Sequence, residues 1–114
     1  MAQLSTHVLD TAHGRPAAGM RIRLFICDGD VRRLVKTAAT TADGRTDEPL
    51  LTGDALAAGI YELVFSVGDY FGIPGEAPPF LGEVVVRFGV SGAAASYHVP
   101  LLVSPYGYTT YRGS

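Results

Sequence analysis

Glycine and proline interrupt this chain at short intervals, and valine, isoleucine, tyrosine and threonine fill the segments between them. Such punctuation is typical of many short strands joined by tight turns, because glycine and proline suit turn geometry whereas β-branched and aromatic residues suit strands. We expect strands at residues 4–10, 20–27, 31–40, 60–67, 83–90, 97–103 and 106–112, with a short one around Arg45. One helical turn is expected at "GDYFG" and a loop or brief turn at "TGDALAAG". This pattern predicts an all-β sandwich or barrel.

Length and charge narrow the range of functions. A chain of 114 residues is long enough for one two-layer core, so residues 1–114 are expected to form a single domain. Because 47% of the residues are hydrophobic and 18% are charged, the chain is neither disordered nor fibrous. The net charge of −2, with acids and bases interspersed, argues against nucleic acid or an anionic membrane as a partner.

Features that direct a protein to a compartment are missing. No apolar run approaches the roughly 18 residues that a membrane helix needs, and the start "MAQLSTHVLD" lacks the features of a secretory signal. Cys27 is the one cysteine, so no internal disulfide is expected. Together with the absence of a terminal Ser-Lys-Leu, these features predict a cytoplasmic protein.

Alternation with a period of two indicates which face each strand buries. In "MRIRLFIC", Ile22, Leu24 and Ile26 share one face, and Arg21 and Arg23 share the other. This strand is expected to have one core face and one wet face.

The first strand and the strand at 97–103 do not follow that pattern. Their inner faces are expected to carry Leu4, Thr6, Val8, Tyr97, Val99, Leu101 and Val103. Their far faces, together with that of the last strand, carry an almost uncharged set: Ser5, His7, Leu9, His98, Pro100, Leu102, Thr109 and Tyr111. An antiparallel sheet buried on both sides indicates that a partner covers the second face. In a chain this small the expected partner is another copy, so we predict a homo-oligomer.

Pro100 breaks a local rule, because proline inside a sheet is expected at an edge or a bulge. The strand at 97–103 is therefore expected to be irregular at Pro100 or to pair poorly there. Such exceptions often mark functional sites.

Several residues are candidates for chemistry. A lone histidine on an apolar face is usually a packing residue, but His7 and His98 share one unusual face, and imidazole exchanges a proton near neutral pH. Arg45, after Asp-Gly, reads by itself as a solvated turn residue, and Arg112 as part of an ordinary last strand. Ser114 adds a hydroxyl and the terminal carboxylate. The ending "TTYRGS", with no polar tail, favours a functional terminus over a frayed one.

Other kinds of site find little support. His7, His13 and His98 are conceivable zinc ligands, but His13 belongs to the "HGRP" turn and no cysteine or carboxylate spacing matches a metal motif. Cys27 closes a predicted core strand and reads as inert rather than nucleophilic. No glycine-rich loop follows a phosphate-binding pattern.

Three segments carry a resemblance: "LSTHVLDTAHGRPAAGM", "TTADGRT" and "YHVPLLVSPYGYTTYRGS". They resemble the 5-hydroxyisourate hydrolase branch of the transthyretin-like family over Leu4 to Ser114. The closing Tyr-Arg-Gly-Ser of that family stands at residues 111–114. The resemblance implies a transthyretin-like (prealbumin-like) eight-stranded β-sandwich with one short helix. It also implies a homotetramer, a dimer of dimers, with sites in a channel between the dimers. One departure is "FLGE" at residues 80–83, where relatives usually read Phe-Phe-Pro-Glu.

The resemblance also implies an activity: hydrolysis of 5-hydroxyisourate, a product of urate oxidation, to 2-oxo-4-hydroxy-4-carboxy-5-ureidoimidazoline, without a metal or cofactor. His7 and His98 match the histidines of the family, and either is a candidate for the base that activates water. Arg45 matches the arginine that would hold substrate oxygens. The closing tetrad supplies the other implied site residues: Tyr111, Arg112 and Gly113 for binding, and Ser114 to orient a histidine or the water.

Two alternatives belong to other functional classes. A non-catalytic small-ligand carrier of the transthyretin type would share the fold and the channel, but it needs an apolar slot, whereas this face carries His7, Arg45, His98 and an arginine-containing terminus. A structural sandwich that merely oligomerises would explain the apolar far face but not the abrupt ending.

Overall fold

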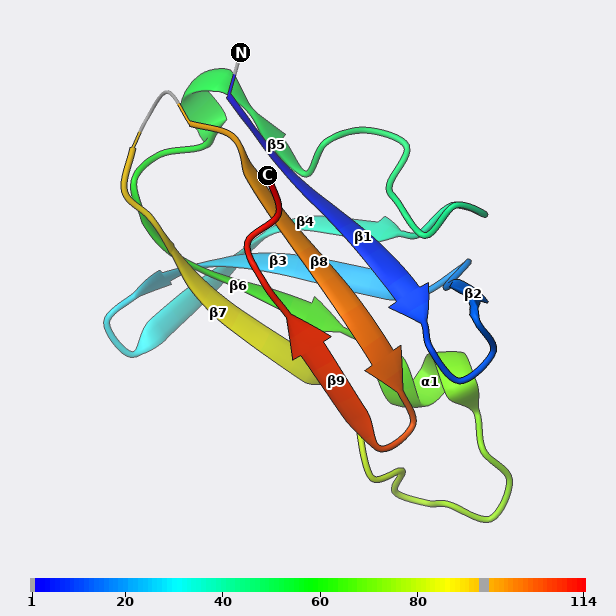
Figure 1. Ribbon diagram of the computed structural model, residues 1–114. Coiled ribbons are helices and arrows are strands. Elements are labelled where there is room, and N and C mark those ends of the chain that lie inside the picture. Colours follow the sequence, from blue (N-terminus) through cyan, green and yellow to red (C-terminus); the bar gives the residue numbers. More distant parts are fainter. Residues whose placement is uncertain (1, 93–94) are drawn as a thin grey trace.

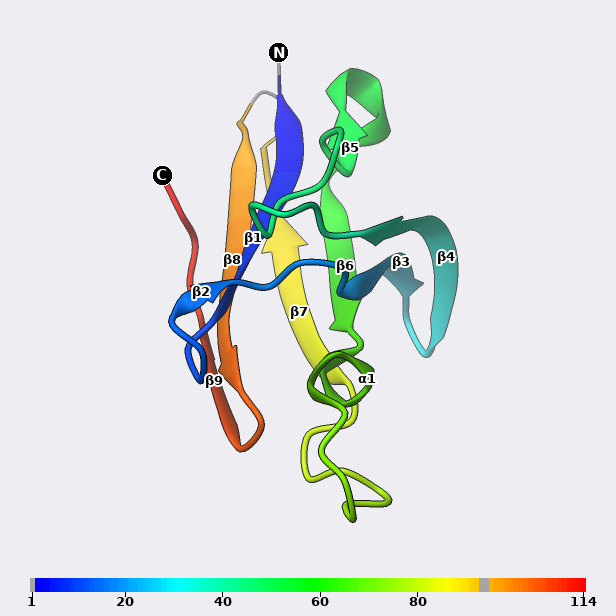
Figure 2. The ribbon, with the colours of Figure 1, turned by 90° about the vertical axis from the view of Figure 1, so that its right-hand side faces the viewer.

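The computed structural model describes residues 2–92 and 95–114, and its strands form two sheets that face each other (Figures 1 and 2). The first sheet has the order β2-β1-β8-β9, with β5 paired to the start of β1. It contains β1 (Gln3–Asp10), β2 (Arg15–Pro16), β5 (Leu51–Thr52), β8 (Tyr97–Ser104) and β9 (Gly107–Thr110). The second sheet has the order β4-β3-β6-β7 and contains β3 (Arg21–Asp28), β4 (Val31–Ala39), β6 (Gly59–Phe65) and β7 (Val84–Val90). The predicted β-sandwich is confirmed.

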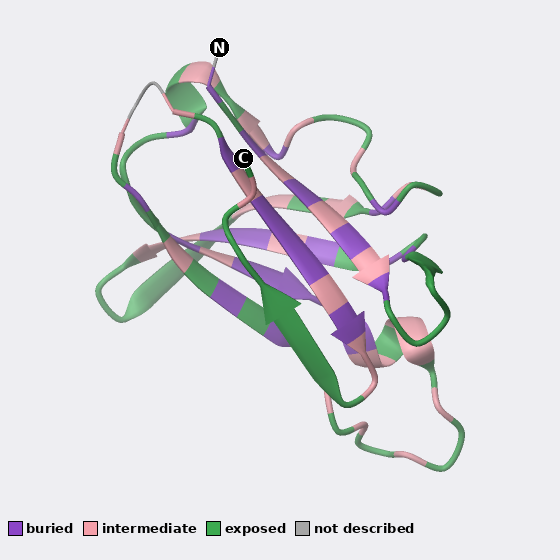
Figure 3. Cartoon of the chain, viewed as in Figure 1, coloured by how far each residue is buried: buried purple, intermediate pink, exposed green. Residues whose placement is uncertain are grey.

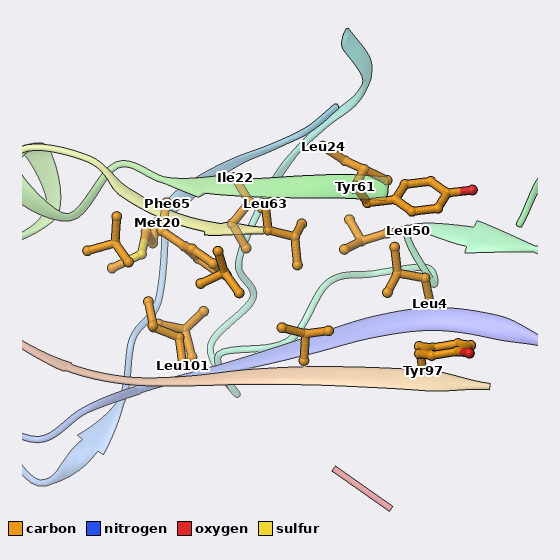
Figure 4. Packing of buried hydrophobic residues seen from close by; sticks show 14 of the residues in the cluster. Leu4, Met20, Ile22, Leu24, Leu50, Tyr61, Leu63, Phe65, Tyr97 and Leu101 are labelled. Carbon is orange, nitrogen blue, oxygen red and sulfur yellow. The ribbon is translucent and has the colours of Figure 1, made fainter. Parts of the chain in front are cut away.

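The core lies between the sheets and holds the residues that alternation assigned to the inner faces (Figures 3 and 4). Leu4 and Val8 of β1 and Leu24 of β3 are 0% exposed. The inner residues of β8 are also buried: Tyr97, Val99, Leu101 and Val103. Burial of one such aliphatic side chain stabilises a fold by about 1.5–3 kcal/mol. Alternation therefore predicted the inner faces of these strands correctly.

Helical structure is confined to two short segments of the described residues. The helix α1 (Val67–Phe71) follows β6 and ends at Gly72, whose φ of 54° is left-handed and favours glycine. It confirms the helical turn expected at "GDYFG". The 3-10 turn η1 (Gly53–Ala55) occupies the predicted loop "TGDALAAG". Within the described part of the chain, no helix has the length and apolar character needed to cross a membrane.

Some predicted boundaries were wrong. β6 ends at Phe65, two residues before the predicted end, because Val67 begins α1. No strand forms around Arg45; the short strand lies at β5 instead, and β2 forms in a predicted turn. The described residues thus contain more strands than the eight expected. β2 and β5 are two-residue pairings of loop backbone with β1, and so short a segment has no alternation to read.

The pairing of β1 with β8 corrects a second expectation. These strands are parallel, not antiparallel, although the far face was expected to belong to an antiparallel sheet. They are neighbours in space but are separated in sequence by the whole second sheet, so no hairpin fixes their relative direction. Parallel pairs are usually buried on both faces, so the correction agrees with the apolar character of the far face.

Candidate active site

His7 and His98 lie on adjacent strands, on the outer face of the first sheet. The parallel register of β1 and β8 places Ser5 opposite His98, and His7 opposite Pro100. Because residues two apart on a strand share a face, both imidazoles project from the same side. Both are half-buried. The structure therefore brings the two predicted histidines together.

Arg45 reaches this face from a loop that is hydrogen-bonded to β1. The backbone N–H of Val8 donates to the carbonyl of Gly44 at 2.8 Å, and that of Thr41 donates to the carbonyl of Arg45 at 2.7 Å. Gly44 has a φ of +78°, and a Cβ at this position would lie 2.3 Å from the carbonyl oxygen of Val8. Only glycine permits this backbone conformation and this close approach. The Asp-Gly-Arg turn thus holds Arg45 beside β1 without a strand.

The C-terminal segment separates from β8 at Pro100 and returns to it at His98. Pairing of β8 with β9 ends at Thr110, one step before Tyr111 would pair with Pro100. Proline has no N–H for that pair, and its carbonyl accepts a hydrogen bond from the Thr110 hydroxyl at 2.8 Å. Pairing resumes as a bridge in which the N–H of Gly113 donates to the carbonyl of His98 at 2.7 Å. The expectation of poor pairing at Pro100 is thus confirmed on the β9 side of the strand, whereas on the other side Pro100 keeps its register with His7 of β1.

An open hollow of about 330 Å³ lies where these segments meet. Figure 2 shows the C-terminus on the outer side of the first sheet, away from the second. The hollow is lined by Gln3, Ser5, Arg45, Ser96, Tyr97, His98, Gly113 and Ser114. Four of these were predicted site residues: Arg45, His98, Gly113 and Ser114. Alternation assigns Ser5 to the correct face, but the sequence pattern does not identify Ser5, two residues before His7, as a site residue.

His7 is not among the residues that line the hollow, although it lies on the same face as His98, and it is oriented by the Arg45 loop. Its Nε2 lies 2.9 Å from the backbone carbonyl oxygen of Asp43. Because a carbonyl only accepts hydrogen bonds, Nε2 is the nitrogen that carries the hydrogen, and Nδ1 holds the lone pair of the neutral ring. The loop that positions Arg45 therefore also fixes the tautomer of His7.

His98 is poised to be neutral. Burial lowers the pKa of His98 below the ordinary value of 6.5, and Coulombic interactions with Arg45 and His7 lower it further, while a backbone hydrogen bond with Ser5 acts in the opposite direction. Its Nδ1 lies 2.9 Å from the hydroxyl oxygen of Ser5. A neutral imidazole retains a lone pair, so His98 is able to accept a proton from a molecule in the hollow.

Tyr111 and Arg112 line a different depression, a groove of about 340 Å³ between β7 and the β8–β9 pair. The guanidinium carbon of Arg112 lies 4.2 Å from the centre of the Tyr97 ring, and its Nη2 donates to the carbonyl of Ser96 at 3.4 Å. Alternation had placed Tyr111 on the face of the two histidines. Because residues 111 and 112 are not paired with β8, alternation no longer determines where their side chains lie.

The third histidine belongs to another cluster. His13 Nδ1 lies 2.7 Å from a carboxylate oxygen of Asp10, which also accepts a hydrogen bond from the Tyr70 hydroxyl at 2.8 Å. These residues line a separate hollow beyond the end of β1. Within residues 2–92 and 95–114, no three His, Cys, Asp or Glu side chains are grouped so as to hold a metal ion.

Known proteins share this sequence and fold. Residues 4–113 match the model of the HIUase/Transthyretin family. "5-Hydroxyisourate hydrolase 2" of Rhizobium meliloti is 56% identical over 98% of this chain and 96% of its own length. The structure of Klebsiella pneumoniae 5-hydroxyisourate hydrolase superposes with a TM-score of 0.81 at 31% identity, covering 100% of both chains. Transthyretin from Sparus aurata superposes with a TM-score of 0.87 at 27% identity, over 99% of this chain and 97% of that one. The chain belongs to the HIUase/Transthyretin family.

Proposed function

We propose that this protein is a 5-hydroxyisourate hydrolase. It opens the ring of 5-hydroxyisourate to give 2-oxo-4-hydroxy-4-carboxy-5-ureidoimidazoline, a step in urate degradation. The observation that carries the proposal is the polar hollow in which Arg45, His98, Gly113 and Ser114 meet. Relatives with the name 5-hydroxyisourate hydrolase are 50–56% identical to nearly the whole chain, which supports the same reaction.

The proposed reaction begins with proton transfer to an imidazole. His98, kept neutral by burial and by Arg45, removes a proton from water as the water oxygen attacks the ring carbonyl carbon. Assistance of this kind usually accelerates a reaction by about 10²–10⁴-fold. The carbon–nitrogen bond then breaks, and His98 returns the proton to the leaving nitrogen. The free lone pair of His7 Nδ1 makes His7 the second candidate for the base.

The remaining residues bind and orient the substrate. Arg45 would hold the carbonyl oxygen and stabilise its developing negative charge; loss of one such donor typically costs about 3–4 kcal/mol in a preorganised site. Ser114 would orient the water or an imidazole, and the backbone of Gly113 would contact the ring. Tyr111 and Arg112 line the neighbouring groove. They remain proposed binding residues, and they would reach a site only through assembly with a second chain.

The carrier alternative has less support. A carrier of the transthyretin type needs an apolar slot, whereas serine, glutamine, arginine and histidine side chains line this hollow. The transthyretin from Sparus aurata is 27% identical to this chain, the Klebsiella pneumoniae hydrolase is 31% identical, and the hydrolases of Rhizobium meliloti, Pseudomonas aeruginosa and Ralstonia nicotianae are 50–56% identical. We therefore favour hydrolysis over storage or transport of a small ligand.

A homotetramer formed as a dimer of dimers is part of the proposal. The outer face of the first sheet carries half-buried Leu9, His98 and Leu102, which is an apolar surface for one interface. β9 is an edge strand that pairs with β8 on one side, and Tyr108 within it and Tyr106 and Tyr111 beside it are exposed; such edges favour a second, separate interface. Two different interfaces are what a dimer of dimers requires. The cytoplasmic location stays a prediction.

Ultraviolet absorbance of freshly oxidised urate tests the reaction. The purified protein should accelerate decay of the 5-hydroxyisourate signal, and His98→Ala should lower the rate by about 10²–10⁴-fold while the protein stays folded. Decay at the same rate with and without the protein would refute the proposed activity. Normal turnover by His98→Ala would leave His7 as the base.

A further inference from the structure

Ser5 makes a contact that the proposed reaction does not use. Its hydroxyl oxygen lies 2.9 Å from Nδ1 of His98, and the two residues are direct partners across the parallel β1–β8 ladder. Both ends of this contact are therefore held by regular backbone pairing. Nδ1 is occupied by the contact, so Nε2 is the His98 nitrogen that remains for a molecule in the hollow.

The direction of the hydrogen bond decides what Nε2 can do. A serine hydroxyl both donates and accepts, so the distance alone allows two tautomers of the neutral ring. In one, Nδ1 accepts from Ser5 and Nε2 carries the hydrogen. In the other, Nδ1 donates to Ser5 and Nε2 holds a lone pair. Only the second tautomer can take a proton from water at Nε2.

The surroundings of Ser5 favour the second tautomer. The backbone carbonyl of Ser5 also stabilises the protonated form of His98. Because a carbonyl only accepts, the nitrogen facing Ser5 is favoured to carry the hydrogen. Arg45 and Ser114 line the same hollow as His98, and the positive charge of Arg45 disfavours a second proton on the ring.

We propose that Ser5 is a positioning residue that accepts a hydrogen bond from Nδ1 of His98, which holds the ring in the tautomer whose Nε2 lone pair faces the substrate. This assignment rests on the proposed function, because it names the group that prepares the base of that reaction. It also distinguishes the two histidines. His7 is held by a carbonyl with its hydrogen on Nε2, whereas His98 is held by Ser5 with its hydrogen on Nδ1.

Nitrogen-15 NMR of the histidine rings tests the tautomer directly. In the full-length wild-type protein at neutral pH, His98 should show a protonated Nδ1 and an unprotonated Nε2, whereas His7 should show the reverse. A protonated His98 Nε2 would overturn the proposal. This measurement needs no turnover, so it separates the tautomer assignment from the proposed activity, which fails only if the wild-type protein does not consume 5-hydroxyisourate.

Substitution of Ser5 tests the consequence for catalysis. Ser5→Val and Ser5→Thr form a matched pair, because valine carries a methyl group where threonine carries a hydroxyl. Ser5→Val should lower kcat about tenfold with little change in KM and should raise the Nε2–H population of His98; Ser5→Thr should restore both. The residual activity reflects the backbone carbonyl, which no substitution removes. Ser104→Ala, which deletes a serine hydroxyl at the far end of β8, serves as the control and should leave kcat unchanged.

The pH profile adds a readout that a structural role would not move. The side chains that act electrostatically on His98 are Arg45 and His7. Ser114, which carries the terminal carboxylate, lines the same hollow, and none of these groups changes in the Ser5 variants. In Ser5→Val the acid limb should move to lower pH, because the ring loses an acceptor for its Nδ1–H. Equal kcat, profile and tautomer in the wild type and Ser5→Val would refute the role of Ser5.

Discussion

At the scale of single residues, the proposed mechanism depends on the ionisation of one imidazole, that of His98. The surroundings of His98 make its charged form unfavourable: the ring is half-buried, and the positive charge of Arg45 repels a proton on it. A cationic His98 has no lone pair and cannot accept a proton. Arg45 therefore has two effects in the proposed mechanism, because it contacts the substrate and keeps the base neutral.

Replacement of Arg45 by methionine should move the acid limb of the pH profile. The pKa of His98 lies below 6.5, and activity requires the neutral ring, so kcat/KM should be constant at neutral pH and fall as pH drops through that pKa. Removal of the Arg45 charge raises the pKa of His98, so the fall in kcat/KM should begin at higher pH. The rate should also be lower at every pH. Initial rates between pH 5 and pH 8 measure this. An unshifted acid limb in Arg45→Met would show that another group controls it.

At the scale of strands and loops, alternation along the sequence correctly predicted which face of each strand is buried, because this depends on neighbouring residues only. It assigned the inner faces of β1, β3 and β8 and put Ser5, His7 and His98 on one outer face. Alternation failed for features that depend on pairing between segments far apart in the sequence. The parallel direction of β1 and β8, the attachment of the Arg45 loop through Gly44, and the departure of Tyr111 from β8 all depend on such contacts.

The terminal segment offers a test at this scale, because it packs its backbone against the ring of His98. A Cβ on Gly113 would lie 2.5 Å from Cδ2 of His98, so Gly113→Ala must displace the imidazole or the segment. A displacement of about 1 Å can cost roughly a hundredfold in rate. We expect kcat to fall by about that factor. The midpoint of thermal unfolding should change little, because Gly113 lies outside the core.

Gly107→Ala is the matched control for that substitution. Gly107 lies in β9, and the nearest atom to an added Cβ would be the Ser104 hydroxyl at 4.0 Å, so this variant should keep both rate and stability. Full activity in Gly113→Ala would mean that the segment yields rather than the imidazole, and that its contact with His98 is not needed for turnover.

At the scale of the whole molecule, the proposed site residues of a single chain are divided between two depressions. The hollow beside His98 is open to solvent, while Tyr111 and Arg112 line a groove at the edge of the sandwich. Electrostatic stabilisation of a transition state is weak in water and strong where water is excluded. A second copy that covers the outer face of the first sheet would enclose the hollow, so assembly and catalysis are expected to be coupled.

Leu102→Arg tests that coupling. Leu102 pairs with Leu9 on the outer face of the first sheet and is half-buried in the single chain, which leaves room for a solvated arginine in a separated subunit. In a covered interface the same arginine would be an unpaired buried charge, which costs several kcal/mol. Sedimentation velocity should therefore find a tetramer for the wild type and smaller species for Leu102→Arg. The activity of the variant should fall more than tenfold, with circular dichroism unchanged.

Val31→Arg, at a position of β4 that is 68% exposed, adds the same charge elsewhere and should leave assembly and activity intact. An active wild-type monomer, or a fully active Leu102→Arg that sediments as smaller species, would show that one chain suffices for the reaction.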